Sequence, residues 1–557
     1  MKVSHRKAIA PGRRRILRAG LASGALFLPV PYAWVWAQSE GAMRLLRAPK
    51  LALVVGNSTY KNVPELKNPA NDAKAIAGTL KGAGFEVTMK LDTTREEMLG
   101  AIRAYLHLIG QKKHIGLFYF AGHGVQLAWR NYLLPVDAVI RSIEDVAKQG
   151  IDIAQLMEGL TRAANPMNVI ILDACRENPF GKDVRVEQKG LSQMDAPNST
   201  LLAYATSPGN VASDGDGTNG LYTENLLREI QVPETKVEDV FKRVRLGVRR
   251  KSNGTQIPWE STSLEEDFWF LPPREIKAAS DAEKERLFAE ELALWEKIQS
   301  STVPAALEDF LLRHPSGSFS ELAQLQLDRV LAKQGEKRIA AASQAGNPYT
   351  QGTARANIGY KVGDSYTYRV LDLETKAQKH TNTSVVSEVR ESSVVFSVES
   401  EAVRAGAPGR RRPGPFIVDL LGNTVELPDG RRYTPRQDQP LEYAIGRRWS
   451  TRFSATTAKG IRSDLEFNFR ITRKERIEVP AGSFECFVIE GVALGVSDTG
   501  NNQETRATRW MAPDTVRRPI ANEITRKVLV AHKEWHRRPI ERVEQSERHE
   551  LTSYKQS

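Results

Sequence analysis

A cysteine and a histidine that each follow an apolar run are the residues of this chain best suited to chemistry. Cys175 comes after the apolar residues 169–172, and His123 comes after the apolar residues 115–121. In nucleophilic acyl transfer a thiolate attacks the acyl carbon, while a nearby imidazole takes and then returns the proton. The two residue types therefore predict a cysteine nucleophile with a histidine base. The chain has only two cysteines, so Cys175 does not belong to a disulfide framework.

The second cysteine, Cys486, leaves plainer interpretations of Cys175 open. In an oxidising compartment the two thiols could form a disulfide, although they lie in regions that the sequence predicts to be separate domains. Cys175 could also be a buried structural thiol, and His123 a histidine whose hydrogen bonds are satisfied at a strand end. Cys486 lies in an apolar run and is interpreted as a small buried residue.

Residues 48–272 carry the alternating pattern of strands and helices that must position this pair. Asn68 followed by proline is typical of a helix start, and Thr94 with a glutamate three residues later is a capping box. Such alternation predicts an α/β domain of three layers, with a mostly parallel sheet between helices. Ligands bind these sheets beyond the carboxyl ends of the strands, which is where His123 and Cys175 are both expected.

Three further regions and a tail follow the α/β pattern. Residues 280–334 are predicted to be helical, and the turn at 313–317 makes a helix hairpin similar to tetratricopeptide-like hairpins. Residues 335–357, rich in Ala, Gly, Gln and Lys, are predicted to be a linker. Residues 358–543 show the short alternating runs of an all-β domain, either a sandwich or an open barrel. The charged residues 544–557 are predicted to be a disordered tail.

The first 37 residues are predicted to be an export signal of the twin-arginine type. Arginines at 13–15 precede an apolar stretch at 19–30, and small residues stand before a cleavage site at residue 37. The protein is therefore expected in the bacterial periplasm, in solution or associated with the envelope. An uncleaved anchor helix is the alternative, but prolines interrupt the apolar stretch, and it is short for a membrane span.

Charge and composition exclude several classes of protein. The predicted signal holds seven basic and no acidic residues, and its removal lowers the formal net charge from +12 to +5. No basic block with interleaved aromatics remains, so nucleic acid is not an expected partner. An apolar fraction of 41% is typical of a folded protein. No other segment approaches the roughly 18 apolar residues of a transmembrane helix.

No metal or other cofactor is expected. Residues 214–219 superficially resemble a calcium-binding loop, but Asn225 stands where such a loop needs a glutamate. A plain turn is the better interpretation of this segment, and activation by calcium is left open.

Five motifs within the predicted α/β region, residues 48–272, resemble those of the caspase-like cysteine peptidases of the C14 type, and they occur in the same order. The bacterial members close to metacaspases and paracaspases are the most similar. The motifs are LVVGN at 53–57, NPANDA at 68–73, YFAGHG at 119–124, NYLLPVD at 131–137 and LDACR at 172–176. The signature of caspases proper has Gln two residues before the Cys and Gly two residues after it. This chain has Asp173 and Glu177 there, which sets it apart from them.

The resemblance implies a role for each residue of the pair. His123 is the general base and acid, and Cys175 is the nucleophile. The backbone amides of Gly124 and Cys175 form the oxyanion hole, which donates hydrogen bonds where negative charge develops on the carbonyl oxygen. A glycine directly after the histidine suits this role, because it lets a substrate backbone approach closely.

Three acids are the expected determinants of specificity. By the same resemblance, Asp72 on the first helix and Asp173 match the positions of S1-pocket acids, and Asp214 aligns loosely as a third. A carboxylate at the base of a pocket favours a cationic side chain, so cleavage after Arg or Lys, and not after Asp, is predicted. The plainer roles are a helix N-terminal acid for Asp72 and strand-end hydrogen bonding for Asp173.

Two functions compete on these observations. The first is an exported cysteine endopeptidase whose partners are protein or peptide substrates with basic P1 residues. The second is a catalytically inactive caspase-fold scaffold of the cell envelope, whose helical hairpin or β domain binds a protein partner. Retention of both dyad residues and of the acids favours the first function, because a scaffold has no chemical need of them.

Overall fold

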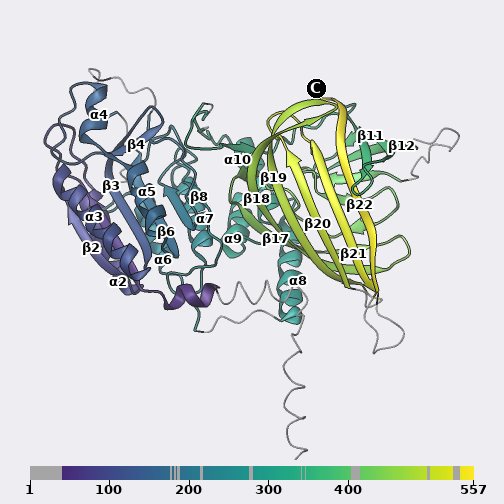
Figure 1. The fold of residues 1–557 in the computed structure, drawn as a ribbon, viewed down its shortest axis with the longest axis horizontal. Coiled ribbons are helices and arrows are strands. Elements are labelled where there is room, and N and C mark those ends of the chain that lie inside the picture. The colour runs from purple at the N-terminus through teal and green to yellow at the C-terminus, as the bar shows by residue number, and fades with distance from the viewer. Residues whose placement is uncertain are drawn as a thin grey trace, which may run out of the picture.

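The computed structural model describes residues 41–557 apart from 176–177, 181–183, 185–188, 214–216, 275–279, 340, 345, 403–413, 498–501 and 531–539. An α/β domain, three helices and a β domain follow one another along the chain. Figure 1 shows α9 (Pro304–Arg313) and α10 (Ser320–Lys333) between the two larger parts. The predicted export signal at 1–37 and the candidate acid Asp214 lie outside the described residues.

The sheet of the α/β domain has the strand order β2-β1-β3-β6-β7-β8, with β4 and β5 attached beside β3. Neighbours along this order are parallel except for β7 and β8, which are antiparallel. The mostly parallel sheet is therefore confirmed. Its strands are β1 (Lys50–Gly56), β2 (Glu86–Leu91), β3 (Ile115–Leu127), β4 (Arg130–Leu133), β5 (Ile151–Asp152), β6 (Met167–Cys175), β7 (Thr200–Tyr204) and β8 (Trp259–Thr262).

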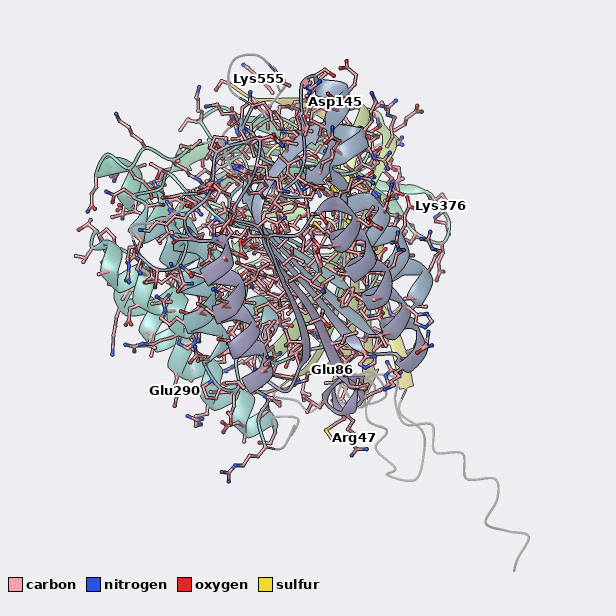
Figure 2. All side chains as sticks on the ribbon, turned by 90° about the vertical axis from the view of Figure 1, so that its left-hand side faces the viewer. Arg47, Glu86, Asp145, Glu290, Lys376 and Lys555 are labelled. Carbon is pink, nitrogen blue, oxygen red and sulfur yellow. The ribbon has the colours of Figure 1, made fainter. Side chains whose placement is uncertain are left out.

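Helices cover both faces of this sheet, as Figure 2 shows from the side. One layer contains α3, which packs against α5, and the other contains α2, α6 and α7, which pack in series. Thr94 caps α3 in the predicted capping box, and a proline opens α2. The helices are α2 (Pro69–Gly82), α3 (Arg95–Lys112), α4 (Ile143–Gln149), α5 (Ile153–Ala163), α6 (Leu221–Ile230) and α7 (Val237–Lys251).

The central strands β3 and β6 form the core of the domain. Their apolar residues before the carboxyl end are fully buried, because helices remove both faces of the sheet from water. A continuous apolar run is therefore what such a strand requires, and it ends where the strand reaches the functional edge.

Three helices connect the α/β domain to the β domain. They are α8 (Asp281–Ile298), α9 and α10, and they pack around Trp295, Phe310 and Phe319. The stretch between α9 and α10 contains the turn predicted at 313–317, so the predicted helix hairpin is present. Leu246 of α7 joins the same apolar cluster, which ties the helices to the α/β domain.

The β domain is a closed antiparallel barrel, not a sandwich or an open barrel. The first strand pairs along its whole length with the second half of the last strand, which closes the sheet. The strands are β10 (Ser365–Asp372), β11 (Gln378–Val389), β12 (Ser393–Ala402), β13 (Phe416–Asp419), β14 (Thr424–Glu426), β15 (Arg432–Tyr433), β17 (Arg448–Thr456), β18 (Arg462–Val479), β19 (Gly482–Ser497), β20 (Asn502–Met511), β21 (Ala521–Val530) and β22 (Ile540–Lys555).

The prediction of a disordered tail at 544–557 is wrong, because these residues belong largely to β22. The charges that suggested disorder have partners on the neighbouring strands. Arg548 lies 2.7 Å from Glu523, and Glu550 lies 2.6 Å from Arg369. Oppositely charged side chains on adjacent strands stabilise their pairing, so a dense run of charges is compatible with an ordered strand.

The segment predicted as a linker, 335–357, lies against both large parts of the molecule. The Asn347 side chain donates to the Gln193 carbonyl, and the backbone amide of Asp195 donates to the Tyr349 carbonyl. Further on, β9 (Thr353–Arg355) pairs with β16 (Glu442–Ala444) beside the barrel. The segment therefore fastens the α/β domain to the barrel rather than only spacing them.

Buried ion pairs also join the parts. Arg249 of α7 lies 2.5 Å from Asp328 of α10 and 2.5 Å from Glu336. Burial alone would raise the pKa of Asp328, but Arg355, Arg249 and Arg338 outweigh it and hold that pKa below its usual value. Isolated buried charges are costly, so each charge in this cluster depends on the others.

Replacing Arg249 by alanine should destabilise the protein by about 3–5 kcal/mol, because it removes the partner of Glu336 and one partner of Asp328 in a buried site. Calorimetric unfolding measures the loss as a lower Tm. Arg250→Ala is the matched control, since Arg250 is 57% exposed and lies 3.6 Å from Glu308; it should cost at most about 1 kcal/mol. Equal Tm shifts for the two variants would contradict the role of Arg249.

Candidate active site

The histidine motif lies at a break in the pairing of β3 with β6. Ala121 is opposite Asp173 and Gly124 is opposite Cys175, so the ladder shifts register between Ala121 and Gly124. Three steps along β3 match two steps along β6, which is a β-bulge. The extra residue falls at the Gly122-His123 pair, directly at the carboxyl end of the parallel ladder.

Each glycine beside His123 is required by close contact. Gly122 has φ +155, and a Cβ there would lie 2.6 Å from the Tyr60 hydroxyl. A Cβ on Gly124 would lie 2.8 Å from the Ala174 carbonyl oxygen. The Gly-His-Gly motif is therefore as much a packing requirement as a chemical one.

His123 is buried, with 4% of its surface exposed, and its ring is oriented by the loop after β1. Its Nε2 atom lies 2.8 Å from the Pro64 carbonyl oxygen. A carbonyl oxygen can only accept, so Nε2 carries the proton of the neutral ring. The other nitrogen, Nδ1, is therefore the basic atom, the one able to accept a proton from a thiol.

Sequence reasoning missed Tyr60 and Pro64, which both contact His123. Tyr60 lies edge-on to the imidazole at 4.7 Å between ring centroids, and its hydroxyl accepts a 2.8 Å hydrogen bond from the His123 backbone amide. The available signal was position, since the loop after β1 starts at the same carboxyl edge of the sheet as His123 and Cys175. Pro64 contributes a backbone carbonyl, which no residue type reveals.

Cys175 is the last residue of β6, and its backbone is opposite Gly124 in the ladder. The two halves of the predicted dyad therefore lie at one edge of the sheet, as predicted; the Cys175 side chain itself lies outside the described part of the chain. Cys486 is a free thiol in the barrel domain, so the disulfide between the two cysteines is not formed. Burial raises the pKa of Cys486 to about 12, which makes it an unreactive thiol.

Two of the three candidate acids, Asp72 of α2 and Asp173 of β6, contact the first residues of α6 or the residues just before it. Asp72 accepts hydrogen bonds from the Asn219 side chain (2.9 Å) and from the Gly220 backbone amide (3.0 Å). Asp173 accepts one from the Thr223 hydroxyl at 2.9 Å. Both carboxylates are buried, so elements distant in sequence bring two negative charges to the same helix end.

A buried tyrosine lies beside both acids and was also missed by sequence reasoning. The Tyr119 hydroxyl lies 2.6 Å from the Thr223 hydroxyl. Because Thr223 donates its only hydroxyl proton to Asp173, Tyr119 must donate to Thr223. Burial, followed by the charges of Asp173 and Asp72, raises the pKa of Tyr119 well above its usual value, so it stays a neutral donor.

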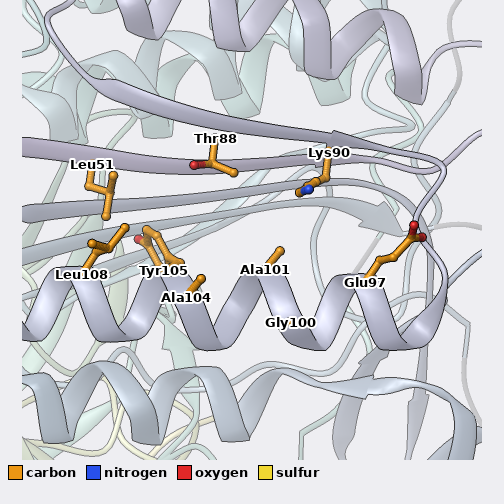
Figure 3. Close-up of a pocket in the computed structure, with 9 residues that line it drawn as sticks. All are labelled: Leu51, Thr88, Lys90, Glu97, Gly100, Ala101, Ala104, Tyr105 and Leu108. Carbon is orange, nitrogen blue, oxygen red and sulfur yellow. The ribbon is translucent and has the colours of Figure 1, made fainter.

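The groove in Figure 3, with a volume of about 420 Å³, is not part of this site. It lies between α3 and the strands β1 and β2. None of its lining residues is a candidate for catalysis or specificity. Over the described residues, no group of three His, Cys, Asp or Glu side chains could hold a metal ion.

The comparisons with known proteins agree with this architecture. Residues 49–269 match the family model of the caspase domain, which covers the sheet and its two helix layers. This part of the chain is therefore a caspase-like domain, with the fold that the motifs led us to expect.

Two curated relatives are similar to part of the chain. The human mucosa-associated lymphoid tissue lymphoma translocation protein 1 is 32% identical over 163 residues, which are 29% of this chain and 19% of the relative. Its homologue in Mus musculus is 32% identical over 163 residues, or 18% of its own length. The chain thus matches about a fifth of each relative, and the helices and the barrel lie outside the caspase domain match.

Proposed function

We propose that the protein is a cysteine endopeptidase that uses His123 and Cys175 as a catalytic dyad. The observation that carries the proposal is the β3–β6 ladder, in which Cys175 is opposite the residue that follows His123. The membership of the domain in the caspase family supports the same chemistry.

The orientation of His123 fits the first step of the proposed reaction. Nε2 donates to Pro64, so Nδ1 takes the proton from the Cys175 thiol as the sulfur attacks the substrate carbonyl carbon. The ring then carries a positive charge, which the Pro64 carbonyl dipole stabilises. The backbone amides of Gly124 and Cys175 donate to the developing oxyanion.

Release of the products completes the cycle. The imidazolium of His123 returns its proton to the leaving amine as the carbon–nitrogen bond breaks, which leaves an acyl group on Cys175. The neutral ring next takes a proton from water, whose oxygen attacks the acyl carbon and frees the thiolate. The imidazolium then gives this proton to the sulfur, which restores the thiol and the neutral ring.

We further propose that substrates carry Arg or Lys at P1. The support is the pair of buried carboxylates, Asp72 and Asp173, at the start of α6. In a site shielded from water, a cationic side chain would gain charge-assisted hydrogen bonds from them. A substrate with an acidic P1 side chain would be repelled.

Short fluorogenic peptides ending in Arg, Lys or Asp test the activity and the preference together. The wild-type protein should cleave the Arg and Lys peptides, and Cys175→Ala and His123→Ala should each lower kcat about a thousandfold or more. Cleavage of the Asp peptide alone would keep the dyad and refute the P1 preference. If no peptide is cleaved in a thiol-dependent way, the inactive scaffold is the better interpretation.

Asp173→Asn should lower kcat/KM for Arg and Lys peptides by about tenfold to a hundredfold, the worth of a hydrogen bond to a charged group, and leave a peptide with a neutral P1 residue unchanged. Steady-state kinetics on the three peptides measures this. Asp309→Asn, on the surface of α9 with a side chain 56% exposed, is the control. A uniform loss over all peptides would instead identify Asp173 as a strand-end structural group.

We propose that the protein is exported, on the strength of the arginines at 13–15 and the apolar stretch after them. Over the described residues, no helix has the length and apolar character to span a membrane. Replacing all three arginines by lysine should keep the protein in the bacterial cytoplasm, as cell fractionation measures. Unchanged export of this variant would argue against the twin-arginine route.

A further inference from the structure

We propose that Tyr60 is a positioning residue that holds the His123 ring and backbone in their productive arrangement. This inference rests on the proposed role of His123 as the base of the dyad. It assigns to the loop after β1 a part in catalysis that is separate from the Pro64 carbonyl.

The Tyr60 hydroxyl joins two backbone segments at His123. It accepts the 2.8 Å hydrogen bond from the His123 amide and donates to the Leu134 carbonyl at 3.3 Å. The Leu134 amide in turn donates to the His123 carbonyl at 2.9 Å. One phenol thereby fixes the backbone on both sides of the histidine side chain.

The bulge explains why a hydroxyl is needed there. A bulged residue leaves the regular strand ladder, and a buried backbone amide without a partner is unfavourable. Tyr60 is 4% exposed and supplies that partner from outside the sheet. Its hydroxyl lies against Gly122, where a Cβ would be only 2.6 Å away, so strand and loop are matched in shape.

The ring of Tyr60 restricts the imidazole as well. The two rings meet edge to face, at 4.7 Å between centroids and 60° between planes. With Nε2 held by Pro64 and one side of the ring against Tyr60, rotation of the imidazole is opposed from two directions. Nδ1 therefore keeps one direction before the substrate arrives, as proximity catalysis requires.

The loop that carries Tyr60 is itself anchored at the end of β2. Asp92 accepts hydrogen bonds from the amides of Ser58 (2.7 Å) and Thr59 (2.8 Å) and from the Thr59 hydroxyl. Farther along the loop, the Lys61 amide donates to the Val136 carbonyl. Hydrogen bonds on both sides of Tyr60 thus hold the loop in place and keep Tyr60 against His123.

Tyr60→Phe tests the hydroxyl while keeping the ring. We expect kcat on the best peptide to fall about tenfold to a hundredfold, with KM changed less than twofold. The pH midpoint for alkylation of Cys175 by iodoacetamide should rise, because a displaced imidazolium stabilises the thiolate less. Cys486 is fully buried, so it does not compete for the reagent.

Two further variants separate positioning from a structural role. Tyr105→Phe is the control, because this buried tyrosine lines the remote groove of Figure 3 and its hydroxyl has no partner among the described residues; its kinetics should match wild type. Asp92→Asn keeps the left-handed backbone (φ 48) that asparagine tolerates, but it replaces the carboxylate by a neutral amide and puts an NH2 group where Oδ2 accepts from the Thr59 hydroxyl. It should lower kcat and raise the alkylation midpoint without touching His123.

The outcomes distinguish this inference from the proposed function. If the wild-type protein shows no thiol-dependent cleavage, the proposed function is refuted whatever the Tyr60 variant does. If the wild type is active and Tyr60→Phe keeps its kcat and its alkylation midpoint, the inference is overturned. A fall in kcat with an unchanged midpoint, accompanied by a lower Tm, would also overturn it, since it marks a structural role only.

Discussion

Between β3 and β6 the parallel ladder loses step at Ala121 and resumes at Gly124, and the candidate site depends on that offset. A regular ladder would place His123 directly opposite Cys175 as one more pair of sheet residues. The bulge instead takes His123 out of the regular ladder, and its backbone amide donates a hydrogen bond to the Tyr60 hydroxyl. Gly122 and Gly124 are closely packed beside it, and the loop after β1 and the segment after β4 hydrogen-bond to the His123 backbone.

The contacts of a single helix, α7, hold the caspase-like domain and the connecting helices together. α7 buries apolar residues in the core of the caspase-like domain, while Leu246 enters the core of the connecting helices. Arg249, on the same helix, reaches the carboxylates of Asp328 and Glu336. One helix thus belongs to two cores, so the connecting helices are held against the caspase-like domain by apolar packing and by buried charge.

The strand and helix pattern was enough to predict the α/β domain and the edge where His123 and Cys175 lie, because apolar runs and helix caps are local signals. The contribution of Pro64 could not be predicted, since it uses a carbonyl that every residue has. Tyr60 stands in a short polar loop without periodicity. Arg249 and Asp328 were equally hidden, because each looks like an ordinary surface charge until α7 and α10 meet.

The barrel shows the limit of composition as a guide. Residues 544–557 are rich in charge, and the prediction that they form a disordered tail left the β domain without its last strand. In the structure their partners lie on β21, the preceding strand, and on β10, which is far away in sequence. A pattern that depends on such distant strands is invisible in any local window.

The pairing of β10 with β22 also has a consequence for the order in which the molecule can assemble. The sheet of the caspase-like domain involves strands within 50–262, so it can form while later residues are still emerging from the ribosome. The barrel cannot close until residues near 555 reach those near 365, and contacts of such long sequence separation form slowly. In the interval β10 and β21 present unpaired edges, which is the period when this chain is most exposed to association with its own copies or to capture by a chaperone.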